Sequence, residues 1–188
     1  MRKIILMMSV SVDGFFEAPG RDISWHLVND ELLEHLNALF RTMSAFMSGR
    51  ITHELMAAYW PTADKDPRLS APMAEFAGIW RGMPKFVFSR TLTGAGWNTT
   101  VVSDVVPDQI AELKAQPGGD IALSGANLAS SLMRHGLIDE YRILVHPVVL
   151  GRGRPLFEDP DVGMSLRLEG TRPFSNGVVL LHYSGGSG

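Results

Sequence analysis

The sequence predicts an α/β domain in three layers, with a mixed, mainly parallel sheet flanked by helices and an antiparallel hairpin at its C-terminal end. Short apolar segments typical of buried strands alternate with segments whose apolar residues recur at helical spacing through the first two thirds of the chain. Near the end, two strand-like segments are separated by a short turn, which indicates an antiparallel pair. Hydrophobic residues make up 45% and charged residues 20%, a composition that supports a packed core.

The first half of the chain supplies two strands and three helices. Leucines at helical spacing define the first helix, and Asn29 or Asp30 is available as its cap. The second helix should stop before Pro61, because proline disrupts a helix interior. Pro72 suits the first turn of the third, where its missing N–H costs nothing. The expected elements are a strand over 3–12, a helix over 29–41, a strand over 45–48, a helix opening at 49–54, a polar loop over 62–69 and a helix starting near 70.

The second half continues this alternation and then becomes rich in strands. Gly136 is suited to close the last helix, since glycine readily adopts the left-handed conformation found there. The turn over 175–177 joins the final two strands. The expected elements are strands over 85–89 and 100–102, a helix over 107–115, a strand over 121–124, a helix over 126–134, and strands over 140–149, 164–170 and 178–183.

Length and charge narrow the protein class. The 188 residues predict a single domain over 1–183, and 184–188 have the composition of a linker, so they are left out of the fold. A net charge of −3 disfavours a nucleic-acid partner, which normally requires a cationic excess. The chain has no cysteine, no apolar stretch long enough to span a membrane, and no cleavage site after its apolar start. We therefore expect a cytoplasmic protein without membrane association.

Two strand-to-helix junctions resemble sites that bind anions. The first contains Gly49, Arg50 and Thr52, which offer open backbone, a guanidinium and a hydroxyl in the first helical turn. The second repeats the pattern of strand, small residues and helix. Capping and steric needs alone also explain such residues. Two junctions in one sheet favour a dinucleotide site, to which the second contributes Ser124, Gly125, Ala126, Asn127 and Leu128.

Other segments offer weaker indications. Ser89, Arg90 and Thr91 follow a strand and are suited to the ribose 2′-phosphate of NADPH, although a solvated turn explains them equally well. Trp25 and Trp60 flank predicted helices and could line a pocket for a flat heterocycle, but core packing is the commoner use of tryptophan. The glycine-rich dinucleotide fingerprint, the phosphate-binding P-loop and metal-ligand spacings of histidine are missing.

The assembled motifs resemble the dihydrofolate reductase superfamily, and more closely the reductase domain of riboflavin-biosynthesis deaminase-reductases. The resemblance rests on 119–128, Leu132, 136–140 and 147–157, which follow the order and spacing of that domain. It implies an NADPH cofactor whose pyrophosphate lies at 49–52 and 125–128 and whose 2′-phosphate lies at 89–91. The segment 9–14 also matches, which implies a cofactor contact for Val12 and a substrate contact for Asp13.

The resemblance also raises a hypothesis about the proton source. Folate reductases place a carboxylate five residues after a loop tryptophan, and Asp30 stands five residues after Trp25. Asp30 is therefore the candidate catalytic residue, with a helix cap as its alternative role. Basic residues for a folate tail or a ribityl phosphate are not identifiable.

These observations predict an NADPH-dependent reductase that transfers hydride to a carbonyl or imine carbon of a small, flat, pterin-, flavin- or pyrimidine-like substrate. A non-catalytic nucleotide- or pterin-binding protein of the same fold is the alternative. A hydrolase that uses Ser124 is disfavoured, because the glycine two residues before a nucleophile elbow is absent. No metal is expected. A homodimer is expected from the resemblance and from the apolar late strands, which are poorly suited to an exposed sheet edge.

Overall fold

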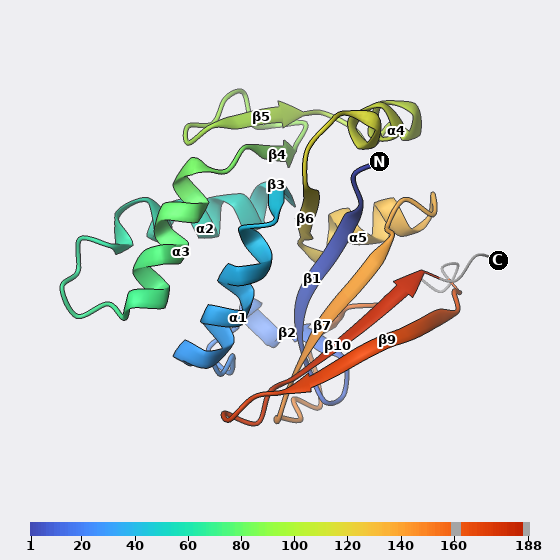
Figure 1. Cartoon of the computed structure of the whole chain (residues 1–188). Coiled ribbons are helices and arrows are strands. Elements are labelled where there is room, and N and C mark those ends of the chain that lie inside the picture. Colours follow the sequence, from blue (N-terminus) through green and yellow to red (C-terminus); the bar gives the residue numbers. More distant parts are fainter. Residues whose placement is uncertain (159–162, 186–188) are drawn as a thin grey trace.

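The computed structural model describes residues 1–158 and 163–185 and contains one large sheet with a small accessory one (Figure 1). The strands of the large sheet are β1 (Ile4–Ser11), β3 (Met43–Gly49), β4 (Lys85–Phe88), β5 (Thr99–Val102), β6 (Asp120–Ser124), β7 (Glu140–His146), β9 (Leu166–Pro173) and β10 (Val179–Gly185). Their spatial order is β5-β4-β3-β6-β1-β7-β10-β9. The accessory sheet pairs β2 (Phe15–Glu17) with β8 (Arg154–Pro155).

The sheet has the predicted mixed, mainly parallel arrangement. Adjacent strands from β5 to β7 are parallel, whereas β10 runs antiparallel to both β7 and β9. The apolar strand β1 pairs with β6 on one side and β7 on the other. Because helices cover both faces of this central strand, its sequence is a continuous apolar run rather than an alternating one.

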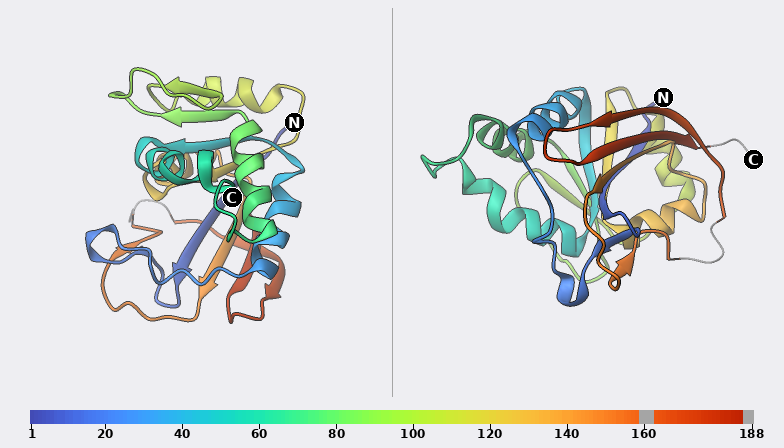
Figure 2. Two further views of the ribbon diagram at one scale, coloured as in Figure 1. Left: turned by 90° about the vertical axis from the view of Figure 1, so that its left-hand side faces the viewer. Right: turned by 90° about the horizontal axis from the view of Figure 1, so that it is seen from below.

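Helices form the two outer layers. They are α1 (Asp30–Phe40), α2 (Arg50–Ala63), α3 (Ala71–Gly82), α4 (Pro107–Ala115) and α5 (Ala126–Met133), with a short 3-10 helix η1 (Pro19–Arg21). Alternate residues of β1 face opposite layers: Ile4 and Leu6 join a core with α4 and α5, whereas Ile5 and Met7 join one with the end of α1. Figures 1 and 2 show α1, α2 and α3 on one side of the sheet and α4 and α5 on the other. None of the described helices combines the length and apolarity that crossing a membrane requires.

Several boundaries differ from the sequence predictions. The second helix does not end before Pro61 but continues to Ala63, because a proline in the last turn removes only one backbone donor near the helix end. The strand predicted over 140–149 ends at His146. The linker assigned to 184–188 is also wrong at its start, since Ser184 and Gly185 pair with β9 at the end of β10. Residues 186–188 lie outside the described residues.

The cap of α1 is Asn29 and not Asp30. The Asn29 Oδ1 atom accepts a hydrogen bond of 3.0 Å from the Leu32 N–H, while Asp30 is the first helical residue. The cap alternative for Asp30 is therefore wrong, because the side chain one position earlier already satisfies the free N–H group.

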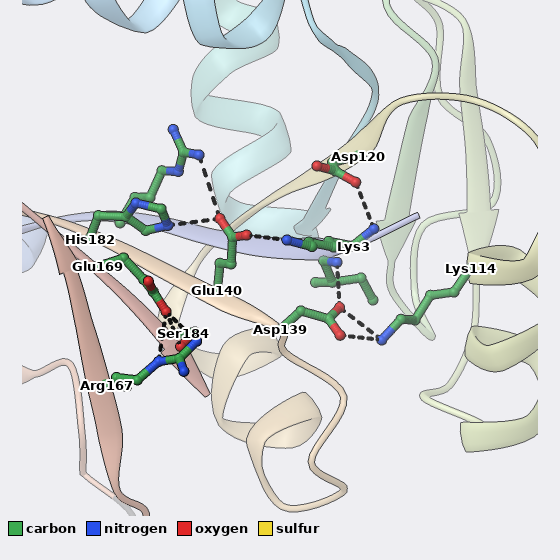
Figure 3. A network of polar contacts seen from close by, with 11 residues as sticks. Lys3, Lys114, Asp120, Asp139, Glu140, Arg167, Glu169, His182 and Ser184 are labelled. Atoms are coloured by element: carbon green, nitrogen blue, oxygen red, sulfur yellow. Dashed lines mark hydrogen bonds and ion pairs between the residues drawn. The ribbon is translucent and has the colours of Figure 1, made fainter. Parts of the chain in front are cut away.

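Polar contacts fasten the amino-terminal end of β1 (Figure 3). The Glu140 carboxylate accepts hydrogen bonds from Lys3 Nζ at 2.7 Å and pairs with His182 Nε2 at 2.9 Å. The neighbouring Asp139 carboxylate binds Lys114 Nζ and the Ile4 N–H, each at 2.8 Å. The acidic pair thus joins β1, α4, β7 and β10, which gives the motif 136–140 a structural role.

Candidate functional site

The two predicted anion-binding junctions are adjacent in space. Ser48 at the end of β3 is the register partner of Ser124 at the end of β6, so both strands deliver the chain to the same edge of the sheet. Gly49 and Gly125 then occupy the N-cap positions of α2 and α5. Neither helix receives a side-chain hydrogen bond at its cap. Two helix N-termini with uncapped N–H groups therefore lie side by side, an arrangement suited to anionic oxygens.

Gly125 shows how closely the two junctions approach. Its φ of 97° favours glycine, and a Cβ at this position would lie only 2.8 Å from Thr52 Oγ1. Gly49 differs, because its backbone is extended and an added Cβ would meet no atom within 4 Å. The space beside Gly49 is consequently open, and the residues present fit a dinucleotide pyrophosphate.

A cleft of about 510 Å³ opens from these junctions. Its walls are mostly apolar, and its polar side chains come from the junctions, from β1 and the segment that follows it, and from β8. Thr52, Ser124 and Asn127 contribute neutral polar groups. The apolar lining consists of Met7, Met8, Phe16, Ile23, Ile51, Leu55, Ala126 and Leu128. Such a surface, with a few convergent polar groups, is typical of a small-molecule site.

A groove of about 660 Å³ continues from the cleft along the sheet edge. It shares Gly49, Asn127 and Leu128 with the cleft and is lined further on by Ser89 and Arg90. The Arg90 guanidinium binds the Asp104 carboxylate, and the Arg50 guanidinium lies 2.9 Å from Glu54 Oε1. The structure thus places Ser89 and Arg90, two of the three predicted 2′-phosphate residues, in one groove with predicted pyrophosphate residues.

Thr91 belongs to the turn rather than to the wall of this groove. Its backbone N–H donates a 3.2 Å hydrogen bond to Ser89 Oγ, and the Leu92 N–H donates to the same oxygen at 3.0 Å. The hydroxyl of Ser89 therefore stabilises the turn that presents Arg90.

An ion pair in the cleft was missed from the sequence. Glu17, whose side chain is 12% exposed, lies 3.1 Å from Arg154 Nη1, and Arg154 Nη2 donates to Asn127 Oδ1 at 2.6 Å. These contacts join the small β2–β8 sheet to α5. Gly153 makes the approach feasible, since a Cβ there would lie 2.3 Å from the Glu17 carbonyl oxygen. In the sequence, the available signal for this close approach was the pair of glycines at 151 and 153, which belong to the motif that carries the family resemblance.

Trp25 is not among the residues that line the cleft, whereas its neighbour His26 is. The Trp25 indole N–H donates to the Asp22 carbonyl at 3.1 Å, and its ring packs edge-on against His26, with ring centroids 4.3 Å apart. His26 also stacks on His146, with ring centroids 5.0 Å apart. Burial lowers the pKa of His26, and burial followed by the proximity of His26 lowers the pKa of His146 to about 4. Both rings are therefore neutral near pH 7.

An inner cavity of about 170 Å³ adjoins the cleft and shares Met7, Thr52 and Ser124 with it. Trp60 does not line this cavity. Its ring packs edge-on against Phe76, which does, with ring centroids 4.5 Å apart.

Three further predicted site residues lie away from the cleft lining. Val12 is 61% exposed, and its N–H donates to the Val148 carbonyl at 2.8 Å. The Asp13 carboxylate accepts hydrogen bonds from the N–H groups of Leu150 and Gly151, and hydrogen bonding, foremost with Ser11, lowers its pKa. Asp30 is exposed at the start of α1. The structure gives Asp13 a role in fixing a loop, and the site roles of all three residues stay predictions.

Comparisons with known proteins agree with this geometry. The chain is 34% identical over 185 residues to the uncharacterized protein YyaP of Bacillus subtilis (strain 168), covering 97% of this chain and 94% of that protein. A putative riboflavin biosynthesis protein from Shewanella sp. PV-4 has a TM-score of 0.74 at 20% identity, covering 98% and 99% of the two chains.

Two further solved structures share the fold. The diaminohydroxyphosphoribosylaminopyrimidine deaminase/5-amino-6-(5-phosphoribosylamino)uracil reductase of Thermotoga maritima gives a TM-score of 0.68 at 15% identity, with 98% of this chain matching 57% of that one. Dihydrofolate reductase from Enterococcus faecalis, complexed with NADP(H), gives a TM-score of 0.61 at 13% identity, covering 98% and 97% of the two chains. These likenesses confirm the dihydrofolate reductase-like fold class.

A family model adds the decisive comparison, since it matches nearly the whole chain. The model of the RibD C-terminal domain covers residues 2–180, which include both junctions, the groove and the β2–β8 sheet. The chain therefore belongs to the RibD C-terminal domain family.

Proposed function

We propose that this chain is an NADPH-dependent reductase that converts a carbonyl or imine carbon of a small, flat, pyrimidine-like substrate. The observation that carries the proposal is the pair of uncapped helix N-termini at Gly49 and Gly125, next to a largely apolar cleft. The reductase named for the Thermotoga relative and the NADP(H) complex of the Enterococcus relative support the same assignment.

The residues that would hold the cofactor extend from the cleft into the groove. Backbone N–H groups at 49–52 and 125–128 would bind the pyrophosphate, and Ser89 with Arg90 would bind the 2′-phosphate. When bound, NADPH supplies the hydride that the reaction requires.

The protein's own part is to position the reactants and exclude water. Met7, Met8 and Phe16 form apolar walls, while the Thr52 and Ser124 hydroxyls offer hydrogen bonds at the point where the cleft meets the inner cavity. An apolar enclosure with few polar groups suits hydride transfer, because bulk water would weaken every orienting contact.

One observation favours the non-catalytic alternative. Among the described cleft residues, Glu17 provides the only carboxylate, and Arg154 already pairs with it. The cleft therefore presents no unpaired acid as an evident proton donor, as expected of a binding protein that retained the pocket without the chemistry.

Binding and turnover separate the two functions. We expect NADPH to bind with fluorescence quenching of the tryptophans and its absorbance to fall when a pyrimidinedione, pterin or flavin from a panel is added. Tight NADPH binding without oxidation by any member would favour the binding protein. Absence of NADPH binding would refute the reductase and would leave only a pterin-binding protein from the alternative.

A further inference from the structure

Residues 22–27, in the loop between β2 and α1, form one wall of the cleft without belonging to a helix or a strand. The cleft-lining side chains of this segment are those of Ile23 and His26. Among the described residues, only two hydrogen bonds connect the segment to the protein beyond its own loop. The Leu27 N–H donates to His146 Nδ1 at 3.0 Å, and the Leu27 carbonyl accepts from Asn176 Nδ2 at 3.1 Å. The polar attachment of this wall therefore depends on the backbone of one residue.

The bond to His146 is the better protected of the two. The contact with Asn176 is exposed, whereas His146 ends β7 and is only 1% exposed. Because its Nδ1 accepts, the neutral ring carries its proton on Nε2, a fully buried atom without a hydrogen-bond partner among the described residues. The ring packs edge-on against Trp25, with centroids 5.5 Å apart, and stacks on His26. A hydrogen bond in such surroundings is stronger than one exposed to water.

A proton on His146 Nδ1 would break this attachment. Nδ1 would become a donor, and two donors would then face each other in place of the present hydrogen bond. The new charge would also lie beside the His26 ring, whose centroid is 5.0 Å away. Because detachment of Leu27 would let the charged ring reach water, the protonated state favours a detached segment.

The surroundings of His146 offer no compensation for a positive charge. Among the described groups, only His26 has a charge that affects the pKa of His146. The neighbours on β1 and β10, Ser11 and Val179, are uncharged. The acids of the surrounding elements that bind backbone N–H groups are Asp13 after β1, Asp22 of the loop and Glu31 of α1, and Asp30 is exposed.

The direction of the pH effect follows from this environment. Burial, and then the charge of His26, lower the pKa of His146 from its ordinary 6.5 to about 4, whereas a detached ring would titrate near 6.5. The detached state therefore binds the proton more strongly. The attachment is fully present above about pH 6.5 and weakens as the pH falls toward 4, by up to about tenfold per pH unit. Burial lowers the pKa of His26 as well, which adds to the effect.

We propose that His146 is a positioning residue whose unprotonated Nδ1 fixes residues 22–27 to the end of β7, and that protonation of His146 detaches this wall of the cleft while the sheet stays folded. Acid thus opens the cleft on the side of Ile23 and His26, whichever ligand the cleft takes. The inference goes beyond the proposed function and does not depend on it, because the protein alone makes the attachment.

NMR of the unaltered protein tests the proposal without a ligand, in a titration from about pH 7.5 to about pH 4.5 that spans this window. The Leu27 amide proton should move upfield as it loses its acceptor, and the Ile23 methyl resonances should move with the same midpoint. The carbon-bound ring protons of His146 should report protonation at that midpoint. The amide resonances of β6 should keep their positions, because the sheet stays folded.

Two substitutions of His146 separate the hydrogen bond from the packing of the ring. Asparagine places its Oδ1 near the position of Nδ1 and does not titrate, so His146→Asn should keep the segment attached and abolish its acid response. His146→Phe keeps an aromatic ring but offers no acceptor, so the segment should be detached even at pH 7. His35→Phe removes another partly buried histidine, on α1, and is the matched control that should respond to acid as the unaltered protein does.

Each of these measurements can overturn the proposal. Leu27 and Ile23 resonances that stay in place throughout the titration would show that acid does not detach the segment. Loss of the β6 resonances at the same midpoint would show global unfolding in place of local release. An unchanged acid response in His146→Asn would assign the proton to another group, and an attached segment in His146→Phe at pH 7 would show that the hydrogen bond does not position it.

Discussion

Gly49 allows the cofactor site to be tested without disturbing the fold. Its extended backbone accepts alanine, and the added methyl would meet no protein atom, so Gly49→Ala should leave thermal stability unchanged. The same methyl would occupy space beside the uncapped helix N-terminus and should weaken NADPH binding at least tenfold. Gly78→Ala on α3, where an added Cβ is equally unobstructed, is the control. Normal NADPH affinity in a stable Gly49→Ala protein would remove the pyrophosphate from this junction.

Gly125 is less informative for the same purpose. Valine there would force a β-branched residue into a left-handed backbone and against Thr52 Oγ1. A loss of binding by Gly125→Val could therefore result from misfolding.

Arg90 determines the expected choice between the two nicotinamide cofactors. Arg90→Ala should weaken NADPH by roughly ten- to a hundredfold and leave NADH almost unaffected, because only NADPH carries the 2′-phosphate. Asp104→Asn should strengthen NADPH binding, since Asp104 competes for the guanidinium and repels phosphate. Fluorescence titrations with both cofactors measure these effects. Equal losses for NADPH and NADH in Arg90→Ala would give Arg90 a structural role.

The family resemblance and the structure predict different results for a substitution of Asp30. A proton donor at this position predicts that Asp30→Asn slows turnover and flattens its pH dependence. Because the structure places Asp30 in solvent and outside the described cleft lining, we expect Asp30→Asn to keep full turnover and NADPH affinity at every pH. The measurement is a pH–rate profile with the substrate found in the panel, and a slowed, flattened profile would restore Asp30 to the mechanism.

At the scale of elements, the start of α1 depends on Asn29. Asn29→Ala removes the acceptor for the Leu32 N–H and should lower the free energy of unfolding by about 0.5–2 kcal/mol. Asn29→Asp keeps the acceptor and should retain most of that stability. Urea denaturation of both variants makes the comparison, and equal losses would show that the cap contributes little.

Elements with a repeating pattern were predictable, and those without one were not. The leucines of α1 and the apolar run of β1 are long enough to show a period or a buried strand. β2 has three residues and β8 has two, which is too short for alternation to be visible. The Glu17–Arg154 pair consequently escaped detection, since only the pairing of those strands brings residues so distant in sequence together.

The site residues likewise include some that a sequence pattern predicted and others that no pattern indicated. Ser48, Gly49 and Ser124, Gly125 were found because parallel strands deliver successive junctions to one sheet edge. The stacked pair of His26 and His146 has no sequence signal, because only the packed structure brings these distant residues together.

At the scale of the whole molecule, Glu140 links stability to pH. Burial alone would raise the pKa of Glu140, but hydrogen bonds from Lys3 and His182 outweigh burial and lower the pKa below its usual 4.5. The resulting stabilisation is complete above the unfolded-state pKa and is lost as the pH falls through the lower folded-state value. Thermal melts should therefore show stability decreasing below about pH 4.5, and Glu140→Gln should lower stability at pH 7 and flatten this decrease. Glu112→Gln on the exposed side of α4 is the control, and an unchanged acid response in Glu140→Gln would contradict the assignment.

The homodimer expected from the sequence stays a prediction. The two outer strands of the sheet are β5 and β9. Leu168 of β9 is exposed, consistent with an edge that a second copy could cover. Light scattering that shows a monomer at micromolar concentration would contradict it.

The central place of β1 also affects how the protein is made. In β1, Ile4 pairs with Ile121 of β6 and Ile5 pairs with Glu140 of β7. The first strand therefore leaves the ribosome long before its partner strands have been synthesised. Long-range pairing of this kind slows folding, and an apolar strand with two free edges invites association with other chains. The nascent protein should consequently depend on chaperones until synthesis has passed β7, and neither junction can face the other before β6 has been added.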